Sequence, residues 1–179
     1  MKLIIKVFLL FIMFNSTASA ALFGDPAVFF SAEHNDLEGI EQFLAKGENP
    51  NIRGKSNITL ISKAAESGSA RIVEKLIEAG ANVNLSDKNG NTALSQSAAQ
   101  GHADIVNMLL RAGAKVDHES RQGETALIKA AQNGHEDTVK ILLQQGADRS
   151  LTDFTGRTAL DHATENRYRR IVKLLESQQ

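Results

Sequence analysis

The sequence contains no cysteine and no tryptophan, only two prolines and one tyrosine, and only 5% aromatic residues. Without cysteine the chain can form no disulfide framework, so apolar burial must hold it together. It also has no excess of charge of either sign, with 20 basic and 21 acidic residues and no charge block. A nucleic-acid partner therefore has no electrostatic support.

The first twenty residues have the composition of a secretory leader. A basic start and an apolar run occupy residues 1–14, and Ala18-Ser19-Ala20 resembles a cleavage signal. We predict a signal peptide at residues 1–20, a mature domain at residues 21–179 and a periplasmic or secreted location. The alternative is an uncleaved anchor, although the apolar stretch is short against the roughly 20 residues that a spanning helix needs. No cysteine follows the leader, which excludes lipoprotein-type attachment there.

An internal repeat organises the rest of the chain. Equivalent residues recur at one constant step, which is typical of a stacked array. The landmarks are Gly90, Gly123 and Gly156; Thr59, Thr92, Thr125 and Thr158; Gly68, Gly101 and Gly134; and Gly47, Gly80, Gly113 and Gly146. They predict five units, at about residues 22–53, 54–86, 87–119, 120–152 and 153–179.

Each landmark has a physical reason. A threonine such as Thr92 can accept a hydrogen bond from the first free amides of a short helix, and Gly101 can end that helix in the left-handed conformation. In the second helix Ile105, Val106 and Leu109 lie at helical spacing and form one apolar stripe. A single unit is too small to bury this stripe, so stacking of neighbours must create the core.

These residues resemble the ankyrin-repeat family. The family pattern of Gly-x-Thr, then Gly-His, then Ile-Val-x-Leu-Leu-Leu and Gly-Ala is matched at Gly90, Thr92, Gly101-His102, Ile105, Val106, Leu109, Leu110 and Gly113-Ala114. The resemblance implies an all-α solenoid of helix-turn-helix units joined by short β-turn or hairpin connections. It also implies a protein-binding scaffold, and we expect a monomer.

No group of residues predicts catalysis, a cofactor or a metal site. His102 and His135 belong to the Gly-His pairs of the repeat, while His34, His118 and His162 look isolated. The glycines follow the repeat and not a nucleotide-binding loop. No pair of carboxylates is placed for acid and base work. We therefore expect a protein that is not an enzyme.

The resemblance implies contact residues at the turn tips and along the first helix of each unit. Phe154 lies near Arg157 and Arg121, a combination enriched at interface hot spots, unless its ring folds back onto the last unit. Phe30 also aligns with the contact row, unless it is buried at the edge. The expected partner-binding residues are Lys55, Asn57, Lys88, Asn89, Asn91, Gln96, Gln100, Arg121, Gln122, Glu124, Lys129, Gln132, Phe154, Arg157 and His162.

The last unit contains one basic cluster, at Arg167, Arg169, Arg170 and Lys173. Two interpretations stay open: a solvated end face of the array, or a docking patch for acidic protein or lipid headgroups.

Resemblance to small exported bacterial ankyrin proteins implies an accessory factor to an exported enzyme, including peroxide-removing catalases and hence oxidative-stress defence. The alternatives are an immunity-type inhibitor of a toxic secreted enzyme and a secreted host-directed effector. After signal cleavage we expect no stable membrane insertion.

Overall fold

The computed structural model describes residues 26–177, which form ten α-helices, one 3-10 helix and no strand. The predicted signal peptide lies outside these residues. The elements are α2 (Ala27–Glu33), α3 (Leu37–Ala45), η1 (Lys55–Asn57), α4 (Leu60–Glu66), α5 (Ala70–Glu78), α6 (Ala93–Gln100), α7 (Ala103–Arg111), α8 (Ala126–Gln132), α9 (Glu136–Gln144), α10 (Ala159–Glu165) and α11 (Arg169–Glu176).

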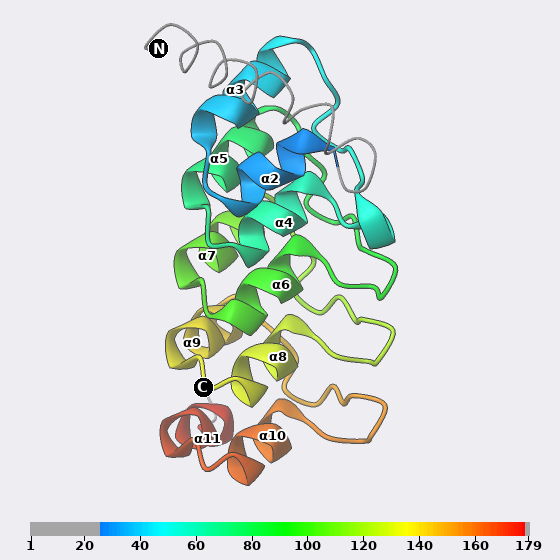
Figure 1. The fold of residues 1–179 in the computed structure, drawn as a ribbon. Coiled ribbons are helices and arrows are strands. Elements are labelled where there is room, and N and C mark those ends of the chain that lie inside the picture. Colours follow the sequence, from blue (N-terminus) through cyan, green and yellow to red (C-terminus); the bar gives the residue numbers. More distant parts are fainter. Residues whose placement is uncertain (1–25, 178–179) are drawn as a thin grey trace, which may run out of the picture.

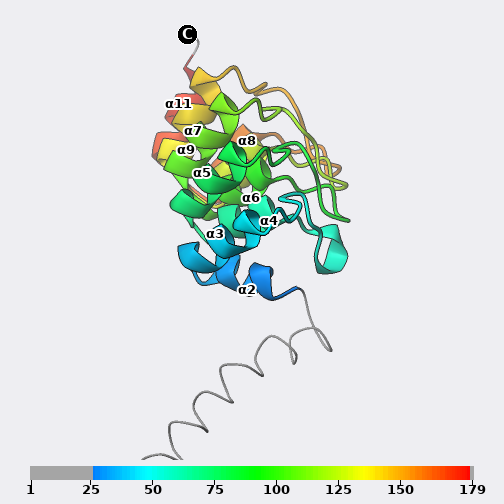
Figure 2. The ribbon, with the colours of Figure 1, turned by 90° about the horizontal axis from the view of Figure 1, so that it is seen from above.

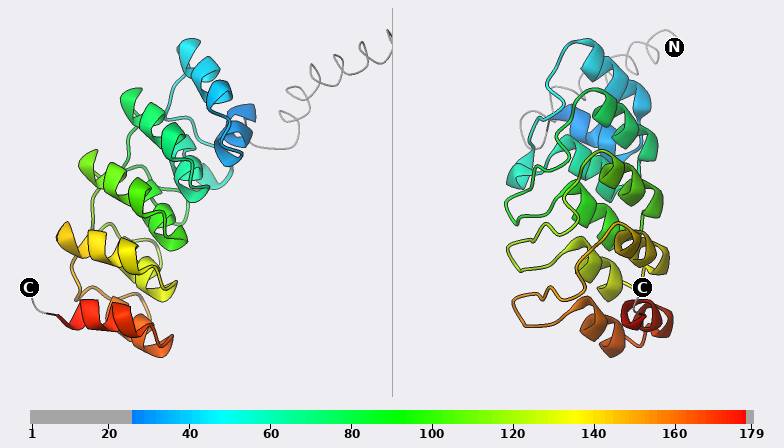
Figure 3. Two further views of the ribbon diagram at one scale, coloured as in Figure 1. Left: turned by 90° about the vertical axis from the view of Figure 1, so that its left-hand side faces the viewer. Right: turned by 180° about the vertical axis from the view of Figure 1, so that it is seen from behind.

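The helices are stacked in pairs along one axis (Figures 1 and 3). The first helices of the pairs, α2, α4, α6, α8 and α10, pack in one row, and α3, α5, α7, α9 and α11 pack in a second row behind it. The long turns between pairs project together to one side of the helices (Figure 2). The predicted all-α repeat array is confirmed. None of the described helices is long and apolar enough to cross a membrane.

The threonine landmarks begin the first helices as expected. The Oγ1 atoms of Thr59, Thr92, Thr125 and Thr158 each accept a hydrogen bond from the backbone amide three residues later, at 3.2–3.3 Å. This bond satisfies one of the free amides at a helix start and stabilises it by about 1 kcal/mol.

One apolar core runs through the stack between the two rows. In the second helices Ile72, Ile105, Leu109 and Leu142 are completely buried, and the first helices bury Leu60, Leu94 and Leu127 against them. The core therefore extends across unit boundaries, as stacking of individually small units requires.

Thr138 of α9 interrupts an otherwise apolar row of this core. Its equivalents at the repeat step are Ile72, Ile105 and Ile171, whereas the Thr138 hydroxyl is buried without a hydrogen-bond partner in the described residues. Replacing Thr138 by Val removes the unsatisfied hydroxyl at nearly constant volume. We expect Thr138→Val to raise the free energy of unfolding by about 1 kcal/mol, measured by urea denaturation. A decrease would show that the hydroxyl is bonded in solution.

Rings from the last three units lie on glycines of the units before them. The His102 ring covers Gly68, His135 covers Gly101 and Tyr168 covers Gly134, so closely that an added Cβ would lie 2.4–2.8 Å from ring atoms. The Nε2 atoms of His102 and His135 also approach the carbonyl oxygens of Glu66 and Ala99, at 3.3 and 3.0 Å. These histidines therefore join successive units.

A second set of bonds joins the units at the exits of the second helices. The side-chain oxygens of Asn51, Asn84 and Asp117, which occupy the same position in successive units, accept from the backbone amides of Asn82, Lys115 and Asp148 at 2.7–3.0 Å. The same polar contact thus recurs at three successive interfaces and holds the stacking geometry constant.

Candidate functional site

The tips of the long turns form a continuous row. The backbone amides of Lys88, Arg121 and Phe154 each donate to a carbonyl of the preceding tip, at 2.8 Å in all three cases. The acceptors are Ser56, Asn89 and Gln122. Lys55 and the three donors occupy the same position in successive units, and all four side chains are exposed. The structure therefore brings the predicted tip residues together in register.

In each of the three later tips, the side chain of the first residue bonds to backbone amides of the same tip. The Asp87 Oδ1 atom accepts from the amides of Asn89 and Asn91, both at 2.8 Å. Ser120 and Asp153 bond the equivalent amides two and four residues later. These contacts fix the shape of the tips, and they engage Asp87 and Asp153 within the protein.

His162 is buried and paired, so the expectation that it is isolated is wrong. Its side chain is 8% exposed, and its Nε2 lies 2.8 Å from the Oδ2 of Asp153. It therefore cannot present a free ring to a partner. Its bond to Asp153 instead holds the turn that carries Phe154. No sequence pattern indicates this pair, because it joins a turn residue to the first helix nine residues later.

The pKa of Asp153 lies well below its ordinary value. Burial would raise this pKa, but hydrogen bonds from the Thr155 hydroxyl, from His162 and from the amides of Arg157 and Thr155 together outweigh burial. The ionised carboxylate is therefore the form that holds the last tip.

We expect Asp153→Asn to lower the free energy of unfolding by about 1–2 kcal/mol at pH 7, because the neutral amide loses the charge-assisted bonds. Since the folded-state pKa of Asp153 is depressed, its contribution is present above the unfolded pKa of about 3.9. It is lost as the pH falls through the folded pKa. The difference between wild type and variant should thus shrink as the pH falls below 4, in urea titrations. A difference that persists undiminished at pH 2 would contradict this account.

Two further pairs engage predicted contact residues. Lys129 and Glu124 form an ion pair at 2.6 Å, with side chains only 15% and 22% exposed. Arg157 pairs with Glu165 at 2.6 Å, but both side chains are about half exposed. A partner can therefore reach Arg157 more easily than Lys129.

The remaining predicted contacts lie at the first two tips and along the first-helix row. Gln100 and Gln132 are exposed at the ends of α6 and α8, and Gln96 is half-buried. Asn91 is half-buried, and its side-chain Nδ2 donates to the Asp87 Oδ2 at 3.3 Å. Asn57 is exposed, with a left-handed backbone, φ of 60°.

Phe154 is the most exposed large apolar side chain of the described residues, at 77%. A Cβ added to Gly123 would lie 2.9 Å from its Cδ1, so the ring lies against the preceding tip and does not fold back onto the last unit. Phe30, at the other end of the stack, is 63% exposed and stacks on His34, with ring centroids 3.9 Å apart. Phe30 is therefore not buried at the edge.

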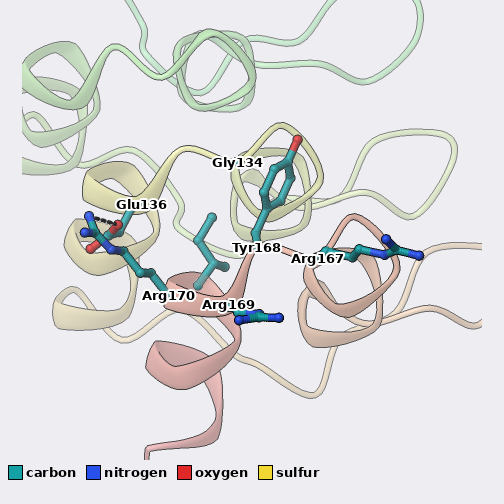
Figure 4. A pocket seen from close by; sticks show the side chains of 7 residues that line it. Gly134, Glu136, Arg167, Tyr168, Arg169 and Arg170 are labelled. Carbon is teal, nitrogen blue, oxygen red and sulfur yellow. Dashed lines mark ion pairs between the residues drawn. The ribbon is translucent and has the colours of Figure 1, made fainter.

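A groove that sequence reasoning missed lies on the side of the last unit, near the start of α11 (Figure 4). It has a volume of about 290 Å³, and its walls include Gly134, Glu136, Tyr168 and the arginines at 167, 169 and 170. Among residues 26–177 no group of three histidine, aspartate or glutamate side chains is placed to hold a metal ion.

The match to a family model agrees with this architecture. A search of curated proteins finds no match. A family model described as "Ankyrin repeats (3 copies)" matches residues 28–120 and 112–179. Together the two matches cover most of the chain, including every described helix pair. On this match and on its helix-pair stack, the chain belongs to the ankyrin-repeat family.

Proposed function

We propose that the chain is an exported scaffold that binds a partner protein through its turn tips and first-helix row. The observation that carries the proposal is the row of tips, in which Lys88, Arg121 and Phe154 are exposed while backbone bonds at 2.8 Å hold their spacing. A surface whose shape is fixed before binding loses little conformational entropy on association. Scaffold binding is also the typical role of ankyrin repeats.

The chemistry of the tips favours a partner with an acidic surface and an apolar pocket. Asp87 and Asp153 are engaged by amides inside the tips, and Glu124 is paired with Lys129. The cations Lys88 and Arg121 are exposed on the same row of tips as Phe154. Aromatic and arginine side chains dominate interface hot spots.

We propose that the partner is an exported enzyme, for which this chain is an accessory factor with a role in oxidative-stress defence. The support is the leader-like composition of residues 1–20 and the resemblance to exported ankyrin proteins. We propose further that the chain acts outside the cytoplasm, as a monomer and without catalysis of its own. Turnover by the purified protein that a single His or Asp substitution abolishes would overturn the last point.

The test is affinity capture from an exported-protein fraction, followed by titration of the captured partner. We expect the double variant Arg121→Gln/Phe154→Ala to bind roughly 100-fold more weakly, because two hot-spot side chains are removed. Lys140→Gln, an exposed cation on α9, is the matched charge control and should bind as wild type. Thermal unfolding of all variants checks the fold.

Equal binding by wild type and the double variant would refute the tip-centred interface. The captured enzyme's activity then separates the roles. Activity maintained or raised by this chain supports the accessory role, whereas a toxic enzyme silenced by it supports an immunity-type inhibitor. Capture of host proteins alone would indicate an effector.

A further inference from the structure

The start of α11 carries a concentrated positive surface on the opposite side of the last unit from the tips. Here α10 begins at its turn tip and ends at Glu165, and the chain then turns through residues 166–168 into α11. We call Arg167, Tyr168, Arg169 and Arg170 the terminal arginine face. All four residues are exposed, and Arg167, Arg169 and Arg170 point outward around the Tyr168 ring (Figure 4).

The charge of this face is only partly neutralised. Arg170 lies 3.5 Å from Glu136 and keeps 85% of its side chain exposed, so this pair is weak. Arg167 and Arg169 extend away from Glu136 (Figure 4), and no described residue forms an ion pair with either of them. The face thus presents two guanidinium groups that nothing in residues 26–177 compensates.

Two local features set this helix start apart from those of earlier units. Arg167 has a left-handed backbone, with φ of 61°, at the position where earlier units have Gly68, Gly101 and Gly134. A side chain in this conformation costs of order 1–2 kcal/mol. The second helices α3, α7 and α9 carry acidic residues in their first turns, whereas α11, like α5, has none and begins with two arginines. Positive charge at this end of a helix opposes the helix dipole.

Two shallow grooves flank the arginines and define what can bind. The groove of about 290 Å³ has Tyr168 and Ile171 in its wall, and a second groove of about 310 Å³ is lined by Thr164, Arg167, Arg169 and Val172. Arg167 and Arg169 line both grooves. Each volume is at the lower limit for a small-molecule site, so it suits one or two side chains better than a cofactor.

We propose that the terminal arginine face binds an acidic segment of a partner protein. Carboxylates of the segment pair with Arg167 and Arg169, and neighbouring apolar side chains enter the grooves beside Tyr168 and Val172. Arginine matches carboxylate geometry with two parallel hydrogen bonds, and its weak hydration favours such pairs at interfaces. The mixed apolar and cationic lining favours a peptide chain over a free anion. This site is independent of the tip-centred interface.

The test measures binding of a fluorescein-labelled peptide, three repeats of Glu-Leu-Glu-Ala, to the purified full chain by fluorescence anisotropy. We expect binding that weakens with salt and a loss of at least about tenfold in Arg167→Gln/Arg169→Gln, since two charge-assisted pairs are removed. Arg111→Gln/Lys115→Gln, an exposed basic pair in another unit, is the matched control and should keep wild-type affinity. The tip variant Arg121→Gln/Phe154→Ala should keep it too.

Unchanged affinity in Arg167→Gln/Arg169→Gln overturns the proposal, as does equal binding of a peptide in which Gln replaces every Glu. Millimolar inorganic phosphate that displaces the peptide completely would show a site for simple anions instead. Vesicles containing an anionic phospholipid are a third probe. If the double variant loses vesicle binding but not peptide binding, the face contacts membranes. Sedimentation that shows self-association lost in the same variant would identify a second copy as the occupant.

Discussion

Replacing Leu109 by Ala is expected to lower the free energy of unfolding by about 3–5 kcal/mol, a large share of the stability of a single domain. Leu109 lies in α7, in the central unit, and its side chain is completely buried. The α7 helix packs against α5, α6 and α9, so the cavity would weaken contacts with both neighbouring units. Because each unit depends on its neighbours, the remaining units cannot compensate.

Urea denaturation followed by far-ultraviolet circular dichroism measures this loss. Leu109→Met is the control, because it keeps the volume and should cost less than about 1.5 kcal/mol. A loss below about 1 kcal/mol in Leu109→Ala, with an unchanged slope in urea, would show that the units stand independently of their shared core.

Gly101→Ala is expected to cost about 2–3 kcal/mol, although it adds a single methyl group. Two effects combine at this position. The backbone of Gly101 is left-handed, with φ of 76°, which costs about 1–2 kcal/mol for a residue with a side chain. The new Cβ would also lie 2.4 Å from Nδ1 of His135, so the ring must move and its 3.0 Å contact with the Ala99 carbonyl is lost.

Gly113→Ala separates these effects. Gly113 has φ of 87°, but an added Cβ there meets nothing within 4 Å. It should therefore show the backbone cost alone, about 1–2 kcal/mol. Gly101→Ala in a His135→Ala background should likewise fall to that value, and a double-mutant cycle measures the difference. Equal costs at Gly101 and Gly113 in the wild-type background would refute the ring contact.

The backbone of the array could be predicted from the sequence because the repeat keeps its step even where individual residue types change. Left-handed conformations recur at the landmark positions even where glycine is missing, at Asn35, Asn57 and Arg167, with φ of 55–61°. Asparagine tolerates this conformation, but arginine does not favour it. The stacking of neighbours therefore imposes the conformation, and glycine only makes it less costly. The helix starts at Thr59, Thr92, Thr125 and Thr158 follow from the same register.

The sequence predicts that the contact residues form a row. It does not predict which of their side chains are free and which are paired within the protein. The repeat step places Lys88, Arg121 and Phe154 on successive tips, as the structure shows. The engagement of Glu124 by Lys129 and of Asp153 by His162 depends on how a turn bends toward its helix. No periodic pattern carries that information, because each pair occurs in one unit only. The groove beside Tyr168 arises where the stack ends, so repetition could not predict it.

The tips have one consequence for how such a surface could change in evolution. Successive tips are joined by one backbone bond each, from Lys88 to Ser56, from Arg121 to Asn89 and from Phe154 to Gln122. In-frame duplication of residues 87–119 would supply one new donor and one new acceptor. The row would therefore gain one tip, and no backbone amide would lose its partner. The length of the binding surface would then grow by one repeat unit at a time, while the side chains of the existing tips stayed unchanged.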